Sequence, residues 1–370
     1  MADPLKTFFD ARLVETLGTQ LHTAQPSFPR DTFVGEARRG LERHELMGRA
    51  RHIMEAMHRA LPSDYPRALE VLLRSLGPIR PDTERKGMDV FFYLPHTLFV
   101  SEHGLEHFEE SMHALHTLTQ RFTAEWAIRP FLERHPERTL ARLREWATDG
   151  NVHVRRLVSE GTRPRLPWGS RLRAFQQDPR PVLALLELLK DDPELYVRRS
   201  VANNLNDIGK DHPEVLVQVA KAWRQDATEE RQWLIRHALR FAIKRGDASA
   251  LEAMGAVKPT GIEVRATSLP GKARVGGAMD LRFEVANRSR RAQSLVVDLA
   301  VYFVKARGEA PKPKVFKVRE LTLGPGQAEE LGKRVSLAQL STRRHYPGLH
   351  RVEARINGLD LPLGAVDVEA

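Results

Sequence analysis

Apolar residues recur at intervals of three and four along the chain up to residue 255. Residues at this spacing share one face of a helix with about 3.6 residues per turn, so the pattern predicts a series of amphipathic helices. Proline, glycine and aspartate interrupt the pattern and separate one helix from the next. The clearest helical segments are 8–21, 33–46, 47–61, 65–76 and 105–118.

From Gly261 onward the period changes to two, which is typical of strands with one buried face. Turn sequences such as Pro270-Gly271 and Asn357-Gly358 separate the alternating runs. About seven short strands of this kind predict an Ig-like antiparallel β-sandwich, here without a disulfide because the chain has no cysteine. The clearest strands lie in 262–266, 279–285, 295–304, 315–318 and 350–356.

The change of period divides the chain into a helical domain, residues 1–258, and a β-sandwich domain, residues 262–370. The segment 258–261 is the predicted linker. A polar loop at 78–88 marks the end of an N-terminal helical cap, residues 1–88. The predicted fold is therefore mainly α, with a small β domain at its C-terminal end.

The helical domain contains an internal repeat. Proline-led helices beginning at residues 136, 179 and 213 are each followed by a second helix whose motif ends in an arginine, at Arg156, Arg199 and Arg236. The steps between these arginines are 43 and 37 residues. Such lengths are typical of the paired helices of HEAT-like repeats, which stack into a solenoid with a concave binding face.

The second helix of each pair carries charge on the side away from its apolar stripe. In the middle repeat the stripe of residues 197, 201, 205 and 208 lies opposite Arg199, Asn203 and Asp207. Arginine recurs at this phase in all three repeats, which predicts a groove that binds phosphate groups. Charges on the solvent-exposed face of an ordinary amphipathic helix are the alternative interpretation. The cationic positions are Arg156, Arg199, Arg236, Arg240 and Lys244.

The overall charge favours a polyanionic partner. The chain carries 58 Lys and Arg against 48 Asp and Glu, a formal net charge of +10. Residues 262–370 hold 19 of these basic residues against 12 acidic ones, so most of the excess lies in the predicted β-sandwich. Its most basic loop is 305–314, which is either a contact for the polyanion or a solvated hairpin tip.

Two carboxylates interrupt the cationic stripe. Glu160 and Asp207 occupy positions where neighbouring repeats have a cation or an amide. A carboxylate that faces a polyanion weakens binding, so these acids either perform chemistry or pair with an arginine to orient it. Trp168 lies in an arginine-rich loop, 161–173, where it either fills a seam between repeats or presents its ring to a ligand.

Other patterns argue against several classes of protein. The absence of cysteine excludes a thiolate metal site and a cysteine nucleophile. No phosphate-binding loop, dinucleotide fingerprint or nucleophile elbow occurs in the sequence. Histidines 103, 107, 113 and 116 resemble a metal site in spacing alone, and we interpret them as ordinary surface or core residues. We expect no metal and no membrane span.

Several motifs resemble a known family. The sequence from Trp233 to Gly246 is similar to the signature of the HEAT-like DNA alkylation repair proteins. Three further segments resemble the AlkC branch of that family: 123–130 with Glu125, 154–168 with Glu160 and Trp168, and 201–207 with Asp207. The AlkC resemblance spans nearly the whole chain, because members of that branch can carry a C-terminal Ig-like domain.

The resemblance implies a monofunctional DNA glycosylase of base excision repair that removes cationic bases such as 3-methyladenine and 3-methylcytosine without flipping them out of the duplex. It assigns Asp207 as the main catalytic carboxylate, with Glu125, Glu160 and Trp168 completing the site. The implied partner is double-stranded DNA with alkylated bases, and no cofactor is needed. We expect a monomeric bacterial protein that is cytoplasmic and acts at the nucleoid.

The same interpretation predicts which cations contact DNA, and one rival function stays open. The rival is a HEAT-repeat scaffold without catalytic activity that binds DNA or protein, or a lesion sensor that binds without excising. A lesion sensor would need the arginines and Trp168 but would tolerate the loss of Asp207. The predicted DNA contacts are Arg156, Arg163, Arg165, Arg199, Arg236, Arg240, Lys244, Lys305 and Arg307.

Overall fold

The computed structural model describes residues 5–79, 89–255, 258–306, 308–309, 312–340 and 343–370. Arg307 and most of the predicted loop 78–88 lie outside these residues. Contacts within the chain divide it into two compact units. The first comprises Met1–His212 with Thr228–Ala238, and the second comprises Pro213–Ala227 with Leu239–Ala370.

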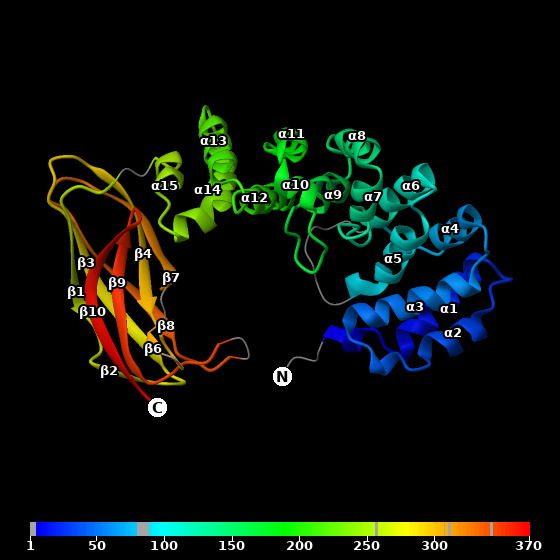
Figure 1. Ribbon diagram of the computed structural model, residues 1–370, viewed down its shortest axis with the longest axis horizontal. Coiled ribbons are helices and arrows are strands. Elements are labelled where there is room, and N and C mark those ends of the chain that lie inside the picture. Colours follow the sequence, from blue (N-terminus) through cyan, green and yellow to red (C-terminus); the bar gives the residue numbers. More distant parts are fainter. Residues whose placement is uncertain (1–4, 80–88, 256–257, 307, 310–311, 341–342) are drawn as a thin grey trace. The chain divides into compact units, whose positions relative to one another are not determined.

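The first unit is helical throughout its described residues (Figure 1). Its helices are α1 (Ala11–Ala24), α2 (Arg30–Arg38), α3 (Leu46–Ala60), α4 (Tyr65–Arg74), α5 (Leu94–His103), α6 (Phe108–Thr119), α7 (Arg129–Arg134), α8 (Pro136–Trp146), α9 (Val152–Gly161), α10 (Arg173–Gln177), α11 (Arg180–Leu189), α12 (Leu195–Ile208) and the first part of α14 (Glu229–Lys244). Short 3-10 helices occupy Leu5–Phe8, Leu41–Arg43 and Asp89–Tyr93.

Local sequence explains where these helices begin. The Asp10 carboxylate accepts a hydrogen bond from the Leu13 backbone N–H at 2.8 Å, and Asn151 caps α9 through the His153 N–H at 2.9 Å. Proline occupies the first turn of α4, α5, α7, α8 and α11, where its missing N–H has no helical partner to lose. The helices expected from periodicity are confirmed, except that segment 33–46 is divided between α2 and a 3-10 turn.

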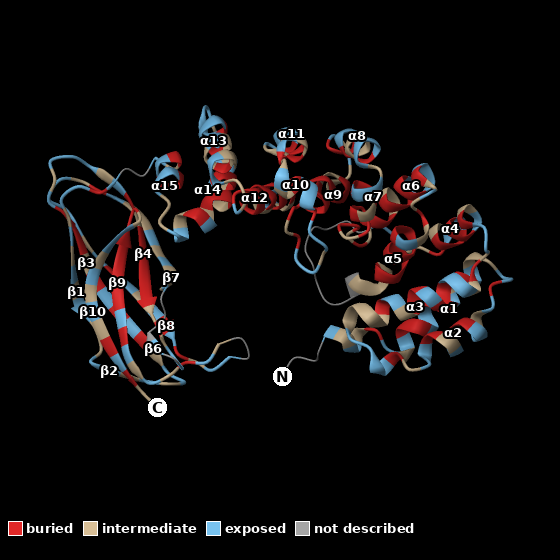
Figure 2. Ribbon diagram, in the orientation of Figure 1, coloured by how far each residue is buried: buried red, intermediate tan, exposed pale blue. Residues whose placement is uncertain are grey.

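Helices α9 and α12 of the first unit pack against each other. The predicted apolar stripe of α12 is confirmed, since Val197, Val201 and Leu205 are fully buried. Polar contacts add to the seam: the Asn204 amide donates to the Ser159 carbonyl at 2.8 Å, and the Ser159 and Ser200 hydroxyls lie 2.7 Å apart. Most residues of both helices are buried (Figure 2), Glu160 and Asp207 among them, whereas Arg199 of α12 is exposed.

The second unit combines α13 (Pro213–Arg224), the end of α14 and α15 (Ala248–Ala253) with a β-sandwich. One sheet has the order β1-β3-β8 and the other β2-β10-β9-β4-β7, and β5 pairs with β6. The predicted switch from helix to strand is confirmed, because β1 begins at Ile262. The strands are β1 (Ile262–Ser268), β2 (Lys272–Arg274), β3 (Ala278–Asn287), β4 (Gln293–Tyr302), β5 (Val304–Lys305), β6 (Gly308–Glu309), β7 (Lys314–Leu323), β8 (Ala328–Ser336), β9 (Gly348–Ile356) and β10 (Leu359–Glu369).

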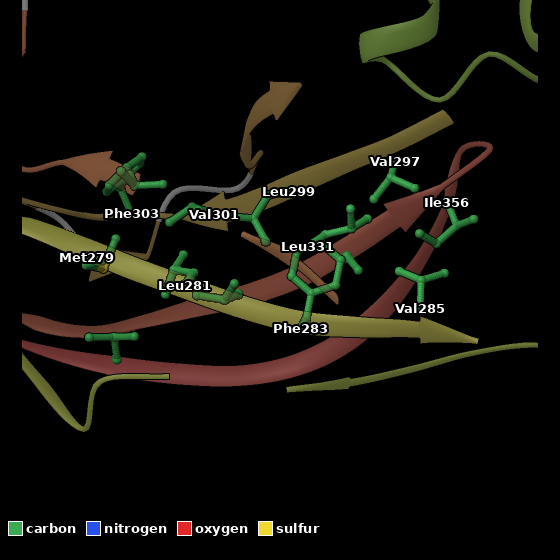
Figure 3. Close-up of a cluster of buried hydrophobic side chains, with 14 of the residues drawn as sticks. Met279, Leu281, Phe283, Val285, Val297, Leu299, Val301, Phe303, Leu331 and Ile356 are labelled. Carbon is green, nitrogen blue, oxygen red and sulfur yellow. The ribbon is translucent and has the colours of Figure 1, made fainter. Parts of the chain in front are cut away.

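Side chains from both sheets interlock in the sandwich core. Phe283 of β3 and Leu331 of β8 pack with Leu299 of β4 and Ile356 of β9 in one buried cluster (Figure 3). Asn357 and Gly358 both have positive φ, 45° and 82°, and join β9 to β10 as a two-residue hairpin turn, as the Asn-Gly pair predicts. Among the described residues, no helix has the length and apolar character needed to cross a membrane.

Candidate functional site

Five segments of the first unit meet at a cavity of about 840 Å³. They are the 3-10 helix Asp89–Tyr93, the turn before α7, helix α9, the loop between α9 and α10, and helix α12 as far as Asn203. Acidic, cationic and aromatic side chains share its wall, which suits a ligand with both charge and flat rings. The lining includes Glu125, Arg156, Glu160, Trp168, Tyr196 and Arg199.

Arg156 of α9 joins two of the acids. Its Nη1 donates to Glu125 Oε2 at 2.5 Å and to the Thr123 hydroxyl at 2.8 Å, and its Nη2 lies 3.5 Å from Glu160 Oε1. The Thr123 hydroxyl in turn donates to Glu125 at 2.7 Å. The guanidinium group also lies 5.3 Å from the centre of the Tyr196 ring. Arg156 is therefore engaged on the cavity wall by acids and an aromatic ring together.

Arg163 extends the ion pairs from Glu160 to Asp207. Its Nη1 donates to Glu160 Oε1 at 2.7 Å, and its Nε donates to Asp207 Oδ2 at 2.8 Å. Lys210 donates to the other Asp207 oxygen at 2.7 Å, and the Ser200 hydroxyl donates to Glu160 Oε2 at 2.7 Å. Carboxylates and cations thus alternate along a buried chain that runs from α9 to the end of α12.

The alternation keeps Glu160 and Arg163 charged despite their burial. Burial opposes the charged form of Glu160, but the guanidinium groups of Arg156 and Arg163 and the Ser200 hydroxyl outweigh it and hold the pKa of Glu160 below its usual value. Burial likewise opposes the charge of Arg163, and its two carboxylate partners raise its pKa. The cavity therefore presents fixed anionic oxygens in surroundings with little water.

Trp168 stands out among the cavity residues by its exposure and its backbone. Its side chain is 65% exposed, and its φ of 60° lies in the left-handed region that residues other than glycine rarely adopt. The Trp126 indole N–H donates to the carbonyl of the preceding residue, Pro167, at 3.2 Å. Trp168 thus presents its ring to solvent at the cavity, and it does not fill a seam between helices.

Comparison with known proteins identifies the family. Residues 109–245 match the family described as DNA alkylation repair enzyme, and residues 263–370 match the C-terminal Ig-like domain of the uncharacterised protein YhaZ. The YhaZ protein of Bacillus subtilis is 37% identical over 360 residues, 97% of each chain. The alkylpurine DNA glycosylase AlkC of Pseudomonas fluorescens, solved bound to DNA containing an abasic-site analogue, is 35% identical over the full length of both chains, with a TM-score of 0.90. The chain belongs to the AlkC family of DNA alkylation repair proteins.

Of the four site residues that the AlkC resemblance named, three line the cavity. Glu125, Glu160 and Trp168 lie on its wall, whereas Asp207 does not and is 1% exposed. The sequence pattern put Asp207 on the polar face of α12, but the loop after α9 covers the end of that helix. Arg163 and Arg165 of the loop pair with Asp207 and Asp211 and bury the site of the predicted carboxylate.

The predicted DNA contacts fall into two groups in this AlkC family member. Arg199, Arg236, Lys244 and Lys305 are exposed and Arg240 is half-buried, while Arg307 lies outside the described residues. Arg156, Arg163 and Arg165 are engaged with carboxylates, and hydrogen bonds to Asp211 raise the pKa of Arg165. In the second group, the arginines pair with the acids, which supports the interpretation that these acids orient arginines. Phosphate binding by these arginines stays a prediction.

Several residues of the cavity were not expected from the sequence. Trp126, Tyr196 and Ser200 line it, and Thr123 and Lys210 hold its acids. Thr123 and Trp126 carried a signal, since they flank Glu125 in the family motif. Lys210 lies three positions after Asp207, a spacing at which side chains on a helix can pair. Tyr196 and Ser200 meet Arg156 and Glu160 from 40 positions away in the sequence, which no spacing rule reveals.

The histidines of the first unit form ring contacts. His103 stacks on His58 with ring centres 3.8 Å apart, His107 stacks on Tyr65, and His116 pairs with Asp149 at 2.8 Å. No group of three or more metal-binding side chains occurs among the residues that the structure describes.

Proposed function

We propose that the protein is a DNA glycosylase that excises alkylated bases. The observation that carries this proposal is the cavity in which Glu125, Glu160 and Arg199 meet beside the exposed ring of Trp168. Support comes from the 35% identity, over both full lengths, with an AlkC enzyme bound to DNA containing an abasic-site analogue, because an abasic site is what a glycosylase leaves. The proposed substrates are duplexes with 3-methyladenine or 3-methylcytosine.

The chemistry of these substrates suits fixed carboxylates. Alkylation at a ring nitrogen gives the base a positive charge, so it departs as a neutral species without an added proton. The positive charge then develops on the deoxyribose, and ionised carboxylates in a dry site stabilise it and orient water for attack. This scheme is hydrolytic and monofunctional and requires no cofactor. The exposed Trp168 ring offers a face for the cationic sugar and base, which stay in the duplex.

Asp207 needs a separate step before it can act on a sugar. Both of its oxygens are occupied, Oδ2 by Arg163 and Oδ1 by Lys210. Arg163 is buried, but the Lys210 side chain is 31% exposed. We therefore propose that Lys210 withdraws when DNA binds and that the freed Oδ1 faces the deoxyribose. Without that movement, Glu160 is the acid with better access to the cavity.

Exposed cations are the proposed DNA contacts. Arg199 lines the cavity and has no ion-pair partner among the described residues, so it is available for a phosphate. Arg199 and Arg236 lie on α12 and α14, the second helices of two proposed HEAT-like repeats. In the sandwich, Lys305, Lys312 and Lys314 line a second cavity and supply a cationic surface. Replacing these three lysines by glutamine should weaken DNA binding and flatten its salt dependence.

The test is base release from methylated DNA. The protein is incubated with duplexes that carry a single 3-methyladenine or 3-methylcytosine, and abasic sites are detected by alkaline cleavage. Release well above the spontaneous rate supports a glycosylase. Tight binding to the lesion without release would instead support a sensor. A sensor is compatible with the ion pairs that occupy both oxygens of Asp207. No preference for methylated DNA would support a scaffold.

A further inference from the structure

Arg129, the first residue of α7, is the largest of the fully buried side chains, at 1% exposure. Its Nη1 donates to the backbone carbonyls of Gly161 at 2.9 Å and Arg163 at 2.8 Å. Its Nη2 donates to the carbonyl of Ser170. These carbonyls lie at the two ends of the segment 161–170, so a single guanidinium group ties together the ends of the loop that carries Trp168.

The carboxylates of Glu133, Glu125 and Asp207 act on the charge of Arg129 only from a distance, where they oppose in part the lowering of its pKa by burial. No ion pair joins Arg129 to an acid within the described residues. Burial lowers its pKa to about 10, and the side chain is still cationic at neutral pH. Nη1 and Nη2 are hydrogen-bonded to the three carbonyls, whereas the buried Nε has no hydrogen-bond partner among the described residues. A buried cation needs such hydrogen bonds, so the three carbonyls and the cation depend on each other. An apolar residue would fill this space without that requirement.

Residues next to Arg129 hold the middle of the same loop. Trp126 donates its indole N–H to the Pro167 carbonyl, before Trp168. After it, a Cβ added at Gly169 would lie 3.2 Å from Trp126 Cδ1 and 3.5 Å from Arg129 Nε, so Gly169 packs tightly on both. A left-handed tryptophan persists only where its surroundings impose that backbone. Contacts on both sides of Trp168 supply this constraint.

We propose that Arg129, assisted by Trp126, is a positioning residue for the excision site. It fixes the 161–170 loop so that the Trp168 ring and the Arg163 guanidinium group keep their places beside Glu160 and Asp207. Glu125 belongs to the same short segment, so one stretch of chain supplies an acid of the site and the clamp on its tryptophan. This inference rests on the proposed glycosylase function.

The main test compares excision with DNA binding in the full chain. Arg129→Met should lower the single-turnover rate of 3-methyladenine release about 30-fold, because small displacements of reacting groups have effects of this size. Its affinity for DNA with an abasic-site analogue should change less than about threefold, since the exposed cations are intact. Arg129→Lys should give an intermediate rate, because one ammonium cannot reach all three carbonyls. Full activity of the lysine variant would contradict the proposal.

A double-mutant cycle tests whether Arg129 acts through the loop. In a Trp168→Ala background, Arg129→Met should lower the rate less than about fivefold, since the ring it positions is gone. An undiminished 30-fold loss would overturn the proposal. Trp126→Phe keeps an aromatic side chain but replaces the indole with a smaller ring that has no N–H, so the hydrogen bond to Pro167 is lost. It should lower the rate severalfold without unfolding the protein, and it tests the proposal even if Arg129→Met is unstable.

Arg49 provides a matched control. It also bridges backbone carbonyls of the first unit, with hydrogen bonds to Lys6 at 3.1 Å, Phe9 at 3.0 Å and His44 at 3.0 Å. In the part of the chain that the structure describes, no hydrogen bond or ion pair joins Arg49 to a residue of the cavity. Arg49→Met should leave the excision rate of the folded protein unchanged. An equal loss of rate in this variant would mean that Arg129 acts through general stability.

A spectroscopic measurement separates failure of this inference from failure of the proposed function. The emission of Trp168 is obtained as the difference between a protein and its Trp168→Phe counterpart. Arg129→Met should lower the anisotropy of this emission and raise its quenching by acrylamide, whether or not the protein excises bases. Unchanged emission would refute the positioning role, whereas a change without wild-type base release would refute only the glycosylase.

Discussion

Two buried carboxyl groups of this protein are equally exposed, yet their pKa values are shifted in opposite directions. Glu160 in the first unit and Asp298 in the β-sandwich are each 5% exposed. Arg156 and Arg163 outweigh the effect of burial on Glu160 and hold its pKa below the usual value. Burial raises the pKa of Asp298 to about 6, and Lys317 and Arg355 oppose this only in part.

The difference lies in where the neighbouring guanidinium groups are engaged. Arg163 is shared between Glu160 and Asp207. Arg355 stands opposite Asp298 in the strand register, but its N–H groups bind Asp360 at 2.6 and 2.7 Å and the Lys244 carbonyl at 2.9 Å. Burial therefore does not decide whether an acid stays ionised. The geometry of its cationic partner does, and the candidate site has that geometry.

Removing the shared cation should have the largest effect on stability. Arg163→Met removes the buried cation that Glu160 and Asp207 share and leaves Glu160 with Arg156 and Asp207 with Lys210. The free energy of unfolding should therefore fall by about 3 kcal/mol. Denaturant unfolding of the full chain measures this. Adding Asp207→Asn should restore part of the loss, because one of the stranded charges is then absent.

The surface pair of Arg319 and Glu329 is the control for this prediction. Arg319 is 59% exposed, and Arg319→Met should hardly change unfolding, as is usual for ion pairs in water. If the two arginine variants lowered the free energy of unfolding equally, burial of the ion pairs would add nothing to their contribution to stability.

We expect Asp298 to make protein stability depend on pH in the opposite direction to an ion-paired acid. Its folded pKa of about 6 lies above the ordinary value of 3.8, so the folded protein binds more protons between these pH values. Stability should therefore fall as pH rises from 4 to 6, by about 2 kcal/mol. Asp298→Asn should remove this fall and raise the unfolding midpoint at pH 7, measured by denaturant titration at several pH values.

Asp360 offers the matched comparison for Asp298 in the same domain. It accepts both hydrogen bonds of the Arg355 fork, and Asp360→Asn should lower the unfolding midpoint at pH 7. A stabilising effect of Asp360→Asn, or a destabilising effect of Asp298→Asn, would contradict the claim that a paired acid stabilises the domain and an unpaired one does not.

Exposed arginines should affect DNA binding and leave stability nearly unchanged. Arg199→Gln should reduce the slope of log affinity against log salt concentration by about one, because one phosphate contact is lost. The neighbouring Arg198 is buried and donates to the carbonyls of Asp192 and Pro193, so Arg198→Gln should leave the slope of the folded protein unchanged. Identical slopes for wild type and Arg199→Gln would contradict a phosphate contact at Arg199.

The sequence was sufficient for the elements that repeat a simple period. Helices α1, α3, α4 and α6 and the start of β1 follow from apolar spacing, and the β9–β10 turn follows from Asn357-Gly358. Strands β8 and β10 were not among the clearest runs, because charged or glycine-containing sequence weakens their alternation. Pairing with β3 and β9 across the sheet stabilises them, and single-segment patterns do not contain that information.

The site was predictable in its members but not in its geometry. Family motifs supplied Glu125, Glu160 and Trp168, which line one cavity. Helical phase put Asp207 on an open face, yet a loop more than 40 residues earlier in the chain covers it through Arg163. Contacts of this kind depend on the path of an irregular loop, which the spacing of apolar residues does not predict.

The most direct test of the account is excision by Asp207→Asn. With a 3-methyladenine duplex under single-turnover conditions, the wild-type protein should release the base, and the variant should do so about 100-fold more slowly or worse. Affinity for DNA with an abasic-site analogue should stay within about threefold of wild type, because the exposed cations are unchanged. Base release by Asp207→Asn at the wild-type rate would contradict a catalytic role for this buried, ion-paired carboxylate.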